Sequence, residues 1–162
     1  MKTWILHDSH FGNGEKIALV MKDVLSQAGT VSVGKVTEVS PETVVGDRPD
    51  VVIVGAAVRK FMTSRTTKNW IRGLSRELEK QGTQIDYGAA FLTHGMPDRM
   101  IAGRGERLRK ALARVGRIRH VYPQWLSARV EKPEGPLVNG SLDACSSMTR
   151  ELIGWMESGV SV

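Results

Sequence analysis

The residues best suited to chemistry lie near the start of the chain. Ser, Asn and Gly gather between residues 9 and 14, directly after a short apolar run at residues 4–6. Apolar side chains then recur at helical spacing from Ile17 to Ala28. A helix N-terminus has unpaired N–H groups and about half a positive charge, so it favours an anion near its first residues. The pattern predicts a strand, a loop and a helix that together hold the phosphate of a ligand.

Two well-known phosphate loops do not match this segment. In GNGEK the two glycines are too close for GxxxxGK[ST], and no Ser or Thr follows Lys16 to hold Mg²⁺. The segment also lacks GxGxxG, the fingerprint of a dinucleotide-binding turn. An ordinary strand-to-helix turn without a ligand stays open as the alternative.

Two histidines fall in expected loops, His10 in the first and His94 in a later one. An imidazole with a pKa of about 6.5 can move protons at neutral pH. Such a group could assist the oxidation of a quinone or a porphyrinogen. The alternative is that His10 is a variable loop residue beside the phosphate and that His94 faces solvent. No spacing typical of a Ser-His-Asp or Cys-His arrangement stands out.

Length and composition indicate a single domain covering residues 1–162, large enough to build a stable core. The single cysteine, Cys145, excludes an internal disulfide and suits a reducing cytoplasm. It falls on an apolar helical face, so we expect a core residue. No apolar run approaches the length of a membrane span, and we expect a soluble cytoplasmic protein.

Positive charge is concentrated in two stretches, within a net charge of +6. Eight Arg or Lys residues against one Glu lie between Arg99 and Arg119. Five more follow one another without an acid between them: Arg59, Lys60, Arg65, Lys68 and Arg72. Such clusters indicate nucleic acid, an acidic protein partner or a solvated helix face. Neither contains interleaved aromatic residues for base stacking, which argues against nucleic acid.

Strand and helix patterns alternate along the chain. We expect strands at residues 4–6, 31–39, 51–54, 85–92 and 118–122, and helices at residues 17–28, 70–82 and 108–115. Ser141 can cap a last helix that runs through Trp155. Residues 41–49 are expected to form a loop, and residues 123–140 a long loop in which a strand at 126–130 stays open. This alternation predicts an α/β fold in three layers, with an open parallel sheet between helices.

Ligands of such folds bind at the carboxyl ends of the strands. The loops after the first, third and fourth strands are residues 10–14, 56–61 and 93–96. All three are therefore expected to converge on one ligand.

With these loops placed, the chain resembles a flavodoxin over nearly its whole length. The first loop of that family commonly reads D/E-S-x-T/F-G-N-T, and residues 8–14 read DSHFGNG. The resemblance implies a five-stranded sheet of order 2-1-3-4-5 and an FMN cofactor bound without a covalent bond. It implies a flavoprotein that transfers electrons, in which the cofactor supplies the chemistry and no protein residue is catalytic.

The resemblance also implies a set of cofactor-binding residues. The first loop would surround the FMN phosphate, and the flavin ring would lie between the other two loops. The residues so assigned are Ser9, His10, Phe11, Gly12, Asn13, Gly14, Ala56, Ala57, Val58, Arg59, Phe61, Thr93, His94, Gly95 and Met96.

Three departures from the family pattern qualify this assignment. Gly14 stands where a Thr or Ser is usual, and the third loop has no Tyr or Trp to cover the flavin, although Phe61 or Trp70 could cover one face. The chain is also basic where most flavodoxins are acidic, which suits an acidic redox partner docking near residues 99–119, or a ligand with more phosphate than FMN. The alternatives are an FMN-dependent oxidoreductase acting on a quinone or porphyrinogen, and a flavin-free interaction domain with a basic docking face.

Overall fold

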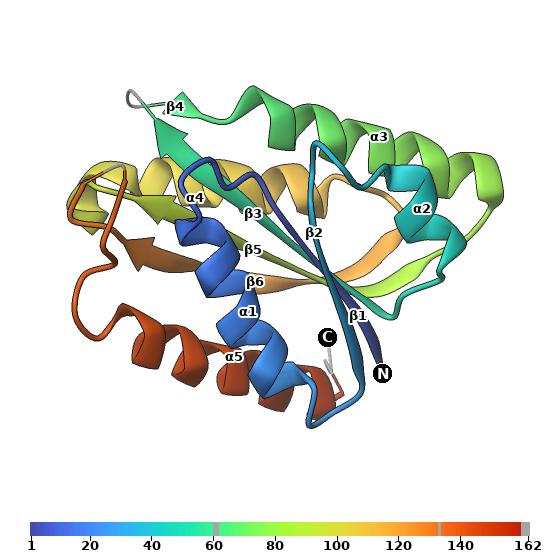
Figure 1. Ribbon diagram of the computed structural model, residues 1–162. Coiled ribbons are helices and arrows are strands. Elements are labelled where there is room, and N and C mark those ends of the chain that lie inside the picture. Colours follow the sequence, from blue (N-terminus) through green and yellow to red (C-terminus); the bar gives the residue numbers. More distant parts are fainter. Residues whose placement is uncertain (60–61, 133, 160–162) are drawn as a thin grey trace.

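The computed structural model describes residues 1–59, 62–132 and 134–159. Five parallel strands form its central sheet in the order β2-β1-β3-β5-β6, and the short β4 pairs antiparallel with the end of β3 (Figure 1). The strands are β1 (Lys2–His7), β2 (Thr30–Lys35), β3 (Val51–Arg59), β4 (Met62–Thr63), β5 (Ile85–His94) and β6 (Ile118–Arg129). This confirms the expected five-stranded parallel sheet and its strand order. The short antiparallel strand β4 was not predicted from the sequence.

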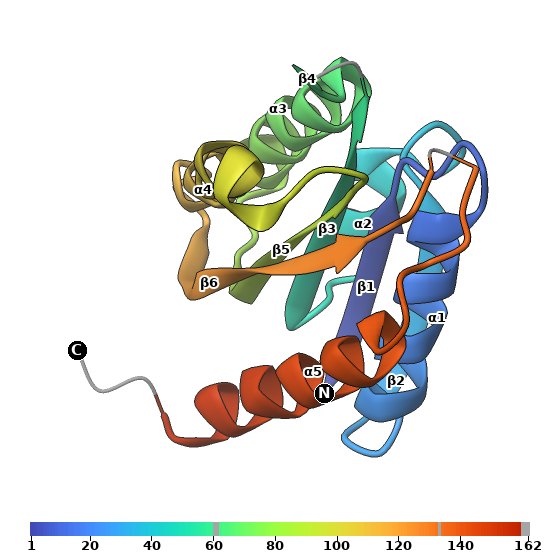
Figure 2. The same cartoon turned by 90° about the vertical axis from the view of Figure 1, so that its left-hand side faces the viewer.

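Helices cover both faces of this sheet and make a three-layer molecule (Figure 2). One face carries α1 and α5, and the other carries α2, α3 and α4. Their bounds are α1 (Asn13–Leu25), α2 (Pro41–Gly46), α3 (Arg65–Gln81), α4 (Asp98–Ala113) and α5 (Ser141–Glu157). Among the residues described, no helix combines the length and the apolar character that crossing a membrane requires.

Strand β3 shows why the sheet is covered on both sides. Its first four residues are an unbroken run of β-branched side chains with no exposed surface. Because side chains alternate along a strand, Val52 and Val54 join the core under α3 and α4, whereas Val51 and Ile53 join the core under α1 and α5. This central strand therefore packs against both helix layers, and its carboxyl end lies where the sequence predicted a ligand to bind.

Small residues let helices approach the sheet closely. A Cβ atom added at Gly105 of α4 would lie 2.1 Å from the Trp125 ring on β6. The small residues of β5 also allow a close approach, since a Cβ at Gly88 would come within 3.1 Å of Leu112 on α4. Trp70 is buried in the core under α3, and its Nε1 donates to the Val39 carbonyl at 2.7 Å. It is therefore a core residue and not a cover for a ligand.

Residues 41–46 form the helix α2, where the sequence predicted a loop. Ser40 caps it by accepting a hydrogen bond from the Thr43 N–H, and Pro41 occupies its first turn. The Pro and Gly that predicted a loop instead mark the beginning and the end of one short helix.

Strand β6 is a single strand of 12 residues, where the sequence predicted a short strand followed by a loop. It continues through Pro123, which cannot donate to a ladder. The strand lies at the sheet edge, and its pairing with β5 shifts register between Gly88 and Ala90, beside this proline. An edge strand with a bulge accommodates a proline that would break a central strand.

The last helix begins differently from the prediction. Gly140, in a left-handed conformation, precedes α5, and no side chain caps the helix. Ser141 is the first helical residue, and its hydroxyl donates to the Arg129 carbonyl instead. Cys145 is buried in the core as expected, and burial raises the pKa of its thiol to about 11.

Candidate functional site

A pocket of about 440 Å³ opens at the carboxyl ends of β1, β3 and β5. The three loops expected to converge do meet here, together with a segment that follows β6. The lining residues are Ser9, His10, Phe11, Asn13, Ala57, Val58, Arg59, Thr93, His94, Gly95, Met96, Val130, Glu131 and Lys132.

Three of the residues assigned from the sequence are described by the structure and do not line this pocket. Gly12 is the residue before α1, with a φ of 86° that favours glycine. Gly14 lies beneath Ser9, because a Cβ at this position would be 3.3 Å from the Ser9 Cβ. Ala56 is buried in the core under α3, and residues 56–59 all continue β3, where the sequence predicted a loop. Phe61 lies outside the described residues.

The first loop combines a buried hydroxyl with an open helix end. Ser9 is 7% exposed, and its Oγ has no hydrogen-bond partner among the described residues. The backbone N–H of Ser9 donates to Nδ1 of His7 at 3.2 Å, so this bond does not use the Ser9 hydroxyl, which can still donate or accept. Helix α1 begins just beyond, after Gly12, with no side-chain cap on its first N–H groups. A buried polar atom and an uncapped helix N-terminus together form a site that suits an anion.

The mouth of the pocket is aromatic on this side. Phe11 is about half exposed, with 47% of its surface accessible, and the His10 ring meets it edge to face at 4.7 Å between centroids. His10 is exposed, as its position in a surface loop suggests.

Asp8 joins the first loop to the second. Its Oδ1 accepts the Ala57 N–H at 2.7 Å, and its carbonyl accepts a hydrogen bond from the Arg59 guanidinium at 2.9 Å. These two bonds connect the residue before the anion-suited loop to the end of β3. The two loops thus form one connected wall of the pocket.

The third loop is held by His94, whose ring is buried. Its Nδ1 lies 2.9 Å from the Met96 carbonyl, so Nδ1 carries the hydrogen, because a carbonyl oxygen can only accept. Its Nε2 lies 2.7 Å from the Ser127 Oγ, which in turn lies 2.9 Å from Oδ1 of Asp98, and the single hydroxyl hydrogen of Ser127 can serve only one of these two contacts. The expectation that His94 faces solvent is wrong, since its side chain has no exposed surface.

The environment of His94 also sets its charge. Burial lowers the pKa of the imidazole, outweighing the hydrogen bond to Met96 and the nearby Asp98, which raise it. The positive charge of Arg129 lowers the pKa further. At neutral pH the ring is therefore uncharged and serves to position the loop between β5 and α4.

Residues 130–132 complete the pocket, and sequence reasoning missed them. They follow β6, where Val130 donates its N–H to the His94 carbonyl at 2.8 Å and forms an isolated bridge with Leu137. The sequence predicted a long proline-rich loop in this region, with a strand at residues 126–130 left open, and neither interpretation placed these residues at the pocket. The extended length of β6 brings this segment to the pocket, and no local motif signals that.

At the level of sequence, no known protein family and no curated protein matches this chain. Solved structures do resemble it. A WrbA-like flavodoxin from Agrobacterium tumefaciens superposes with a TM-score of 0.75 at 12% identity, over 97% of this chain and 98% of that one. Oxidised flavodoxin 1 from Bacillus cereus gives a TM-score of 0.72 at 14% identity, over 95% and 98%. The chain has the flavodoxin-like fold.

A longer protein contains a region with this fold. Rubredoxin oxygen:oxidoreductase from Desulfovibrio gigas superposes with a TM-score of 0.74 at 16% identity, over 99% of this chain. The flavodoxin-like chain spans 37% of that protein's length.

The basic stretch at residues 99–119 runs across the flavodoxin-like domain and away from the pocket. Helix α4 begins beside the pocket, at Asp98, and crosses to the opposite edge of the sheet. Arg119 lies at that opposite edge, where its guanidinium pairs with Asp86 near the start of β5 at 3.1 Å. Only the beginning of the stretch is therefore close to the pocket.

Proposed function

We propose that this protein binds FMN without a covalent bond in the pocket and carries electrons between redox partners in the cytoplasm. The observation that carries the proposal is the buried Ser9 hydroxyl, which has no protein partner among the described residues and lies beside the uncapped N-terminus of α1. Buried polar groups are almost always hydrogen-bonded, so a partnerless hydroxyl at such a place suits a ligand phosphate.

The rest of the pocket fits the other part of the cofactor. Its volume of about 440 Å³ lies within the usual range for small-molecule sites. Phe11, Val58 and Met96 supply apolar surface for a ring, and the second and third loops supply backbone groups for its polar edge. Bound FMN would supply the electron-accepting ring, and the protein would bind and orient it.

Burial of His94 favours a carrier over an enzyme. Its ring has no exposed surface and holds the third loop through Met96 and Ser127, so it cannot reach a second substrate in this conformation. The alternative is an FMN-dependent oxidoreductase acting on a quinone or a porphyrinogen. His10 supports that alternative, since it is exposed at the mouth of the pocket.

The partner in this proposal is a redox protein with an acidic surface that docks near residues 99–119. The net charge of +6 supports this choice, because opposite charges steer two proteins toward each other. A flavin-free interaction domain is the outcome if the cofactor does not bind.

An absorbance spectrum of the purified protein, before and after incubation with FMN and dialysis, tests the proposal. We expect flavin bands that survive dialysis. Absence of retained flavin, together with no binding on titration, would overturn it in favour of the interaction domain. With flavin bound, saturable turnover of a quinol would identify the enzyme, whereas slow turnover proportional to quinol concentration is expected of a carrier.

A further inference from the structure

Ion pairs divide the basic residues of this protein into two groups. In the first group, carboxylates already neutralise the charge. Glu106 pairs with Arg109 at 2.6 Å and with Lys110 at 3.7 Å on α4, and Glu79 pairs with Arg117 at 3.3 Å. Much of the basic stretch after the pocket is therefore locally compensated.

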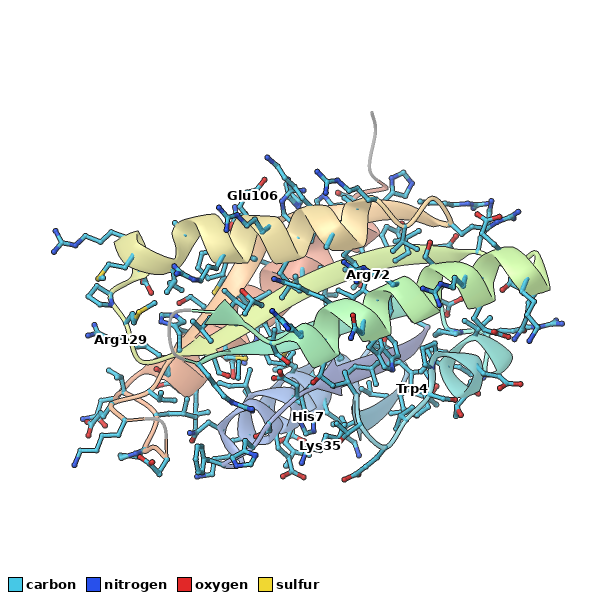
Figure 3. All side chains as sticks on the ribbon, turned by 90° about the horizontal axis from the view of Figure 1, so that it is seen from above. Trp4, His7, Lys35, Arg72, Glu106 and Arg129 are labelled. Atoms are coloured by element: carbon cyan, nitrogen blue, oxygen red, sulfur yellow. The ribbon has the colours of Figure 1, made fainter. Side chains whose placement is uncertain are left out.

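The second group has no carboxylate partner in the described part of the chain, and it includes residues in several parts of the molecule, such as Lys22 of α1 and Arg150 of α5. Six of its members lie on or directly after α3 and α4, which cover the same side of the sheet, and we call these six the basic face (Figure 3). They are Arg65, Lys68, Arg72 and Arg76 of α3, Arg107 of α4, and Arg114, which directly follows α4.

Helical spacing places the α3 members on the side away from the core. Arg65, Arg72 and Arg76 are seven and four residues apart, which puts them on one side of a helix. All three are exposed, and the buried residues of α3, such as Leu74, lie on the other side. The charge is thus presented to the surroundings and not to the fold.

The position of two of these cations opposes helix stability. The first turn of α3 contains Arg65 and, just beyond it, Lys68, with no acidic residue. Cations near a helix N-terminus are unfavourable, because the positive end of the helix dipole lies there. These two cations destabilise the start of α3 and have no carboxylate partner among the described residues, which is typical of side chains that bind another molecule.

We propose that the basic face docks a protein with an acidic surface. The face offers no stacking platform for bases, because the one aromatic residue of α3 and α4, Trp70, is buried. That favours an acidic protein over a nucleic acid. Both α3 and α4 begin at the pocket edge of the sheet, so a protein on this face reaches the pocket as well. That the docked protein exchanges electrons rests on the proposed function, whereas the docking itself does not.

Charge reversal on the full-length protein tests the docking. The probe is a poly-L-glutamate peptide, with a single-stranded oligonucleotide of equal charge as the competing ligand. Arg72→Glu with Arg107→Glu changes the basic face, and Lys22→Glu with Arg150→Glu makes the same change of net charge on α1 and α5, on the opposite side of the sheet. Binding is measured by fluorescence anisotropy at several salt concentrations.

We expect the first double variant to raise the Kd for the peptide by about tenfold or more, and the second by less than about twofold. Peptide binding by the unaltered protein should weaken steeply as salt rises. Equal weakening in the two double variants would overturn the proposal, as would tighter binding of the oligonucleotide than of the peptide. The assay needs no flavin, so failure of FMN to bind would leave its result interpretable. Circular dichroism of both variants verifies that they fold.

Discussion

Helices α1 and α3 both begin at the end of the sheet where the pocket lies, yet the N–H groups of their first turns are capped differently. Helix α3 is closed, because the Ser64 side chain accepts a hydrogen bond from the Thr67 N–H. Helix α1 follows Gly12 in a left-handed conformation and has no side-chain cap. The nearby Ser9 hydroxyl is also without a partner among the described residues. The N-terminus of α3 is capped by a side chain of the protein itself. The N-terminus of α1 has no such cap, so its first N–H groups can bind a ligand.

The largest expected effect tests the open end directly. Gly12→Asp places a carboxylate at the start of α1, where no atom lies within 4 Å of the new Cβ. Two like charges about 4 Å apart near a protein surface repel by about 4 kcal/mol, so we expect FMN to bind at least about 100-fold more weakly. Fluorescence titration with FMN measures this.

Gly12→Asn is the matched control, since it has the same size and the same strain at a φ of 86° without the charge. The left-handed conformation costs either variant about 1–2 kcal/mol of stability. Normal FMN affinity in Gly12→Asp would show that the phosphate does not lie at α1.

A second, smaller effect concerns Ser9. Ser9→Ala removes a hydroxyl that makes no bond within the described protein, so we expect unchanged or slightly higher thermal stability. If the hydroxyl binds the phosphate, the variant loses about 1.4 kcal/mol, or about tenfold, in FMN affinity. Thermal unfolding without ligand and FMN titration measure the two quantities separately. A clear loss of stability in the ligand-free variant would mean that the hydroxyl serves the fold.

Ser64→Ala is expected to give the opposite result. Loss of the cap should lower the free energy of unfolding by about 1 kcal/mol and leave FMN affinity unchanged. Chemical denaturation measures the first and titration the second. Ser64→Thr keeps the capping oxygen and should retain most of the stability. If Ser64→Ala weakened FMN binding as much as Ser9→Ala, the contrast between the two helix ends would fail.

The smallest effect is a pH dependence of stability. Burial is the main cause that lowers the pKa of both His94 and His7 below the ordinary value of about 6.5. As pH falls below that value the unfolded chain takes up protons before the folded one, so stability decreases with falling pH. Thermal melts between pH 5 and 8 should show this. In His94→Gln the slope against pH should be shallower, and an unchanged slope would assign the effect to other groups.

Sequence patterns predicted the parts of the fold that depend on local chemistry. The β-branched run of β3 and the end of α3 at Gly82, whose φ is 64°, are both visible in the sequence. The burial of His94 is not visible, because it depends on Ser127 from β6 and on Asp98 from α4. The contribution of residues 130–132 to the pocket was equally hidden, since the edge strand had to continue through Pro123.

The link from Asp8 to β3 has a consequence for ligand binding. Its carboxylate and carbonyl already accept hydrogen bonds from the Ala57 N–H and the Arg59 guanidinium, so the first loop is fixed to the end of β3 when the chain folds. Ordering a loop at the moment of association costs affinity, because conformational entropy is lost then. Here that entropy is lost during folding. The pocket is preorganised along this wall, because a ligand entering it meets a first loop that is already fixed to the end of β3.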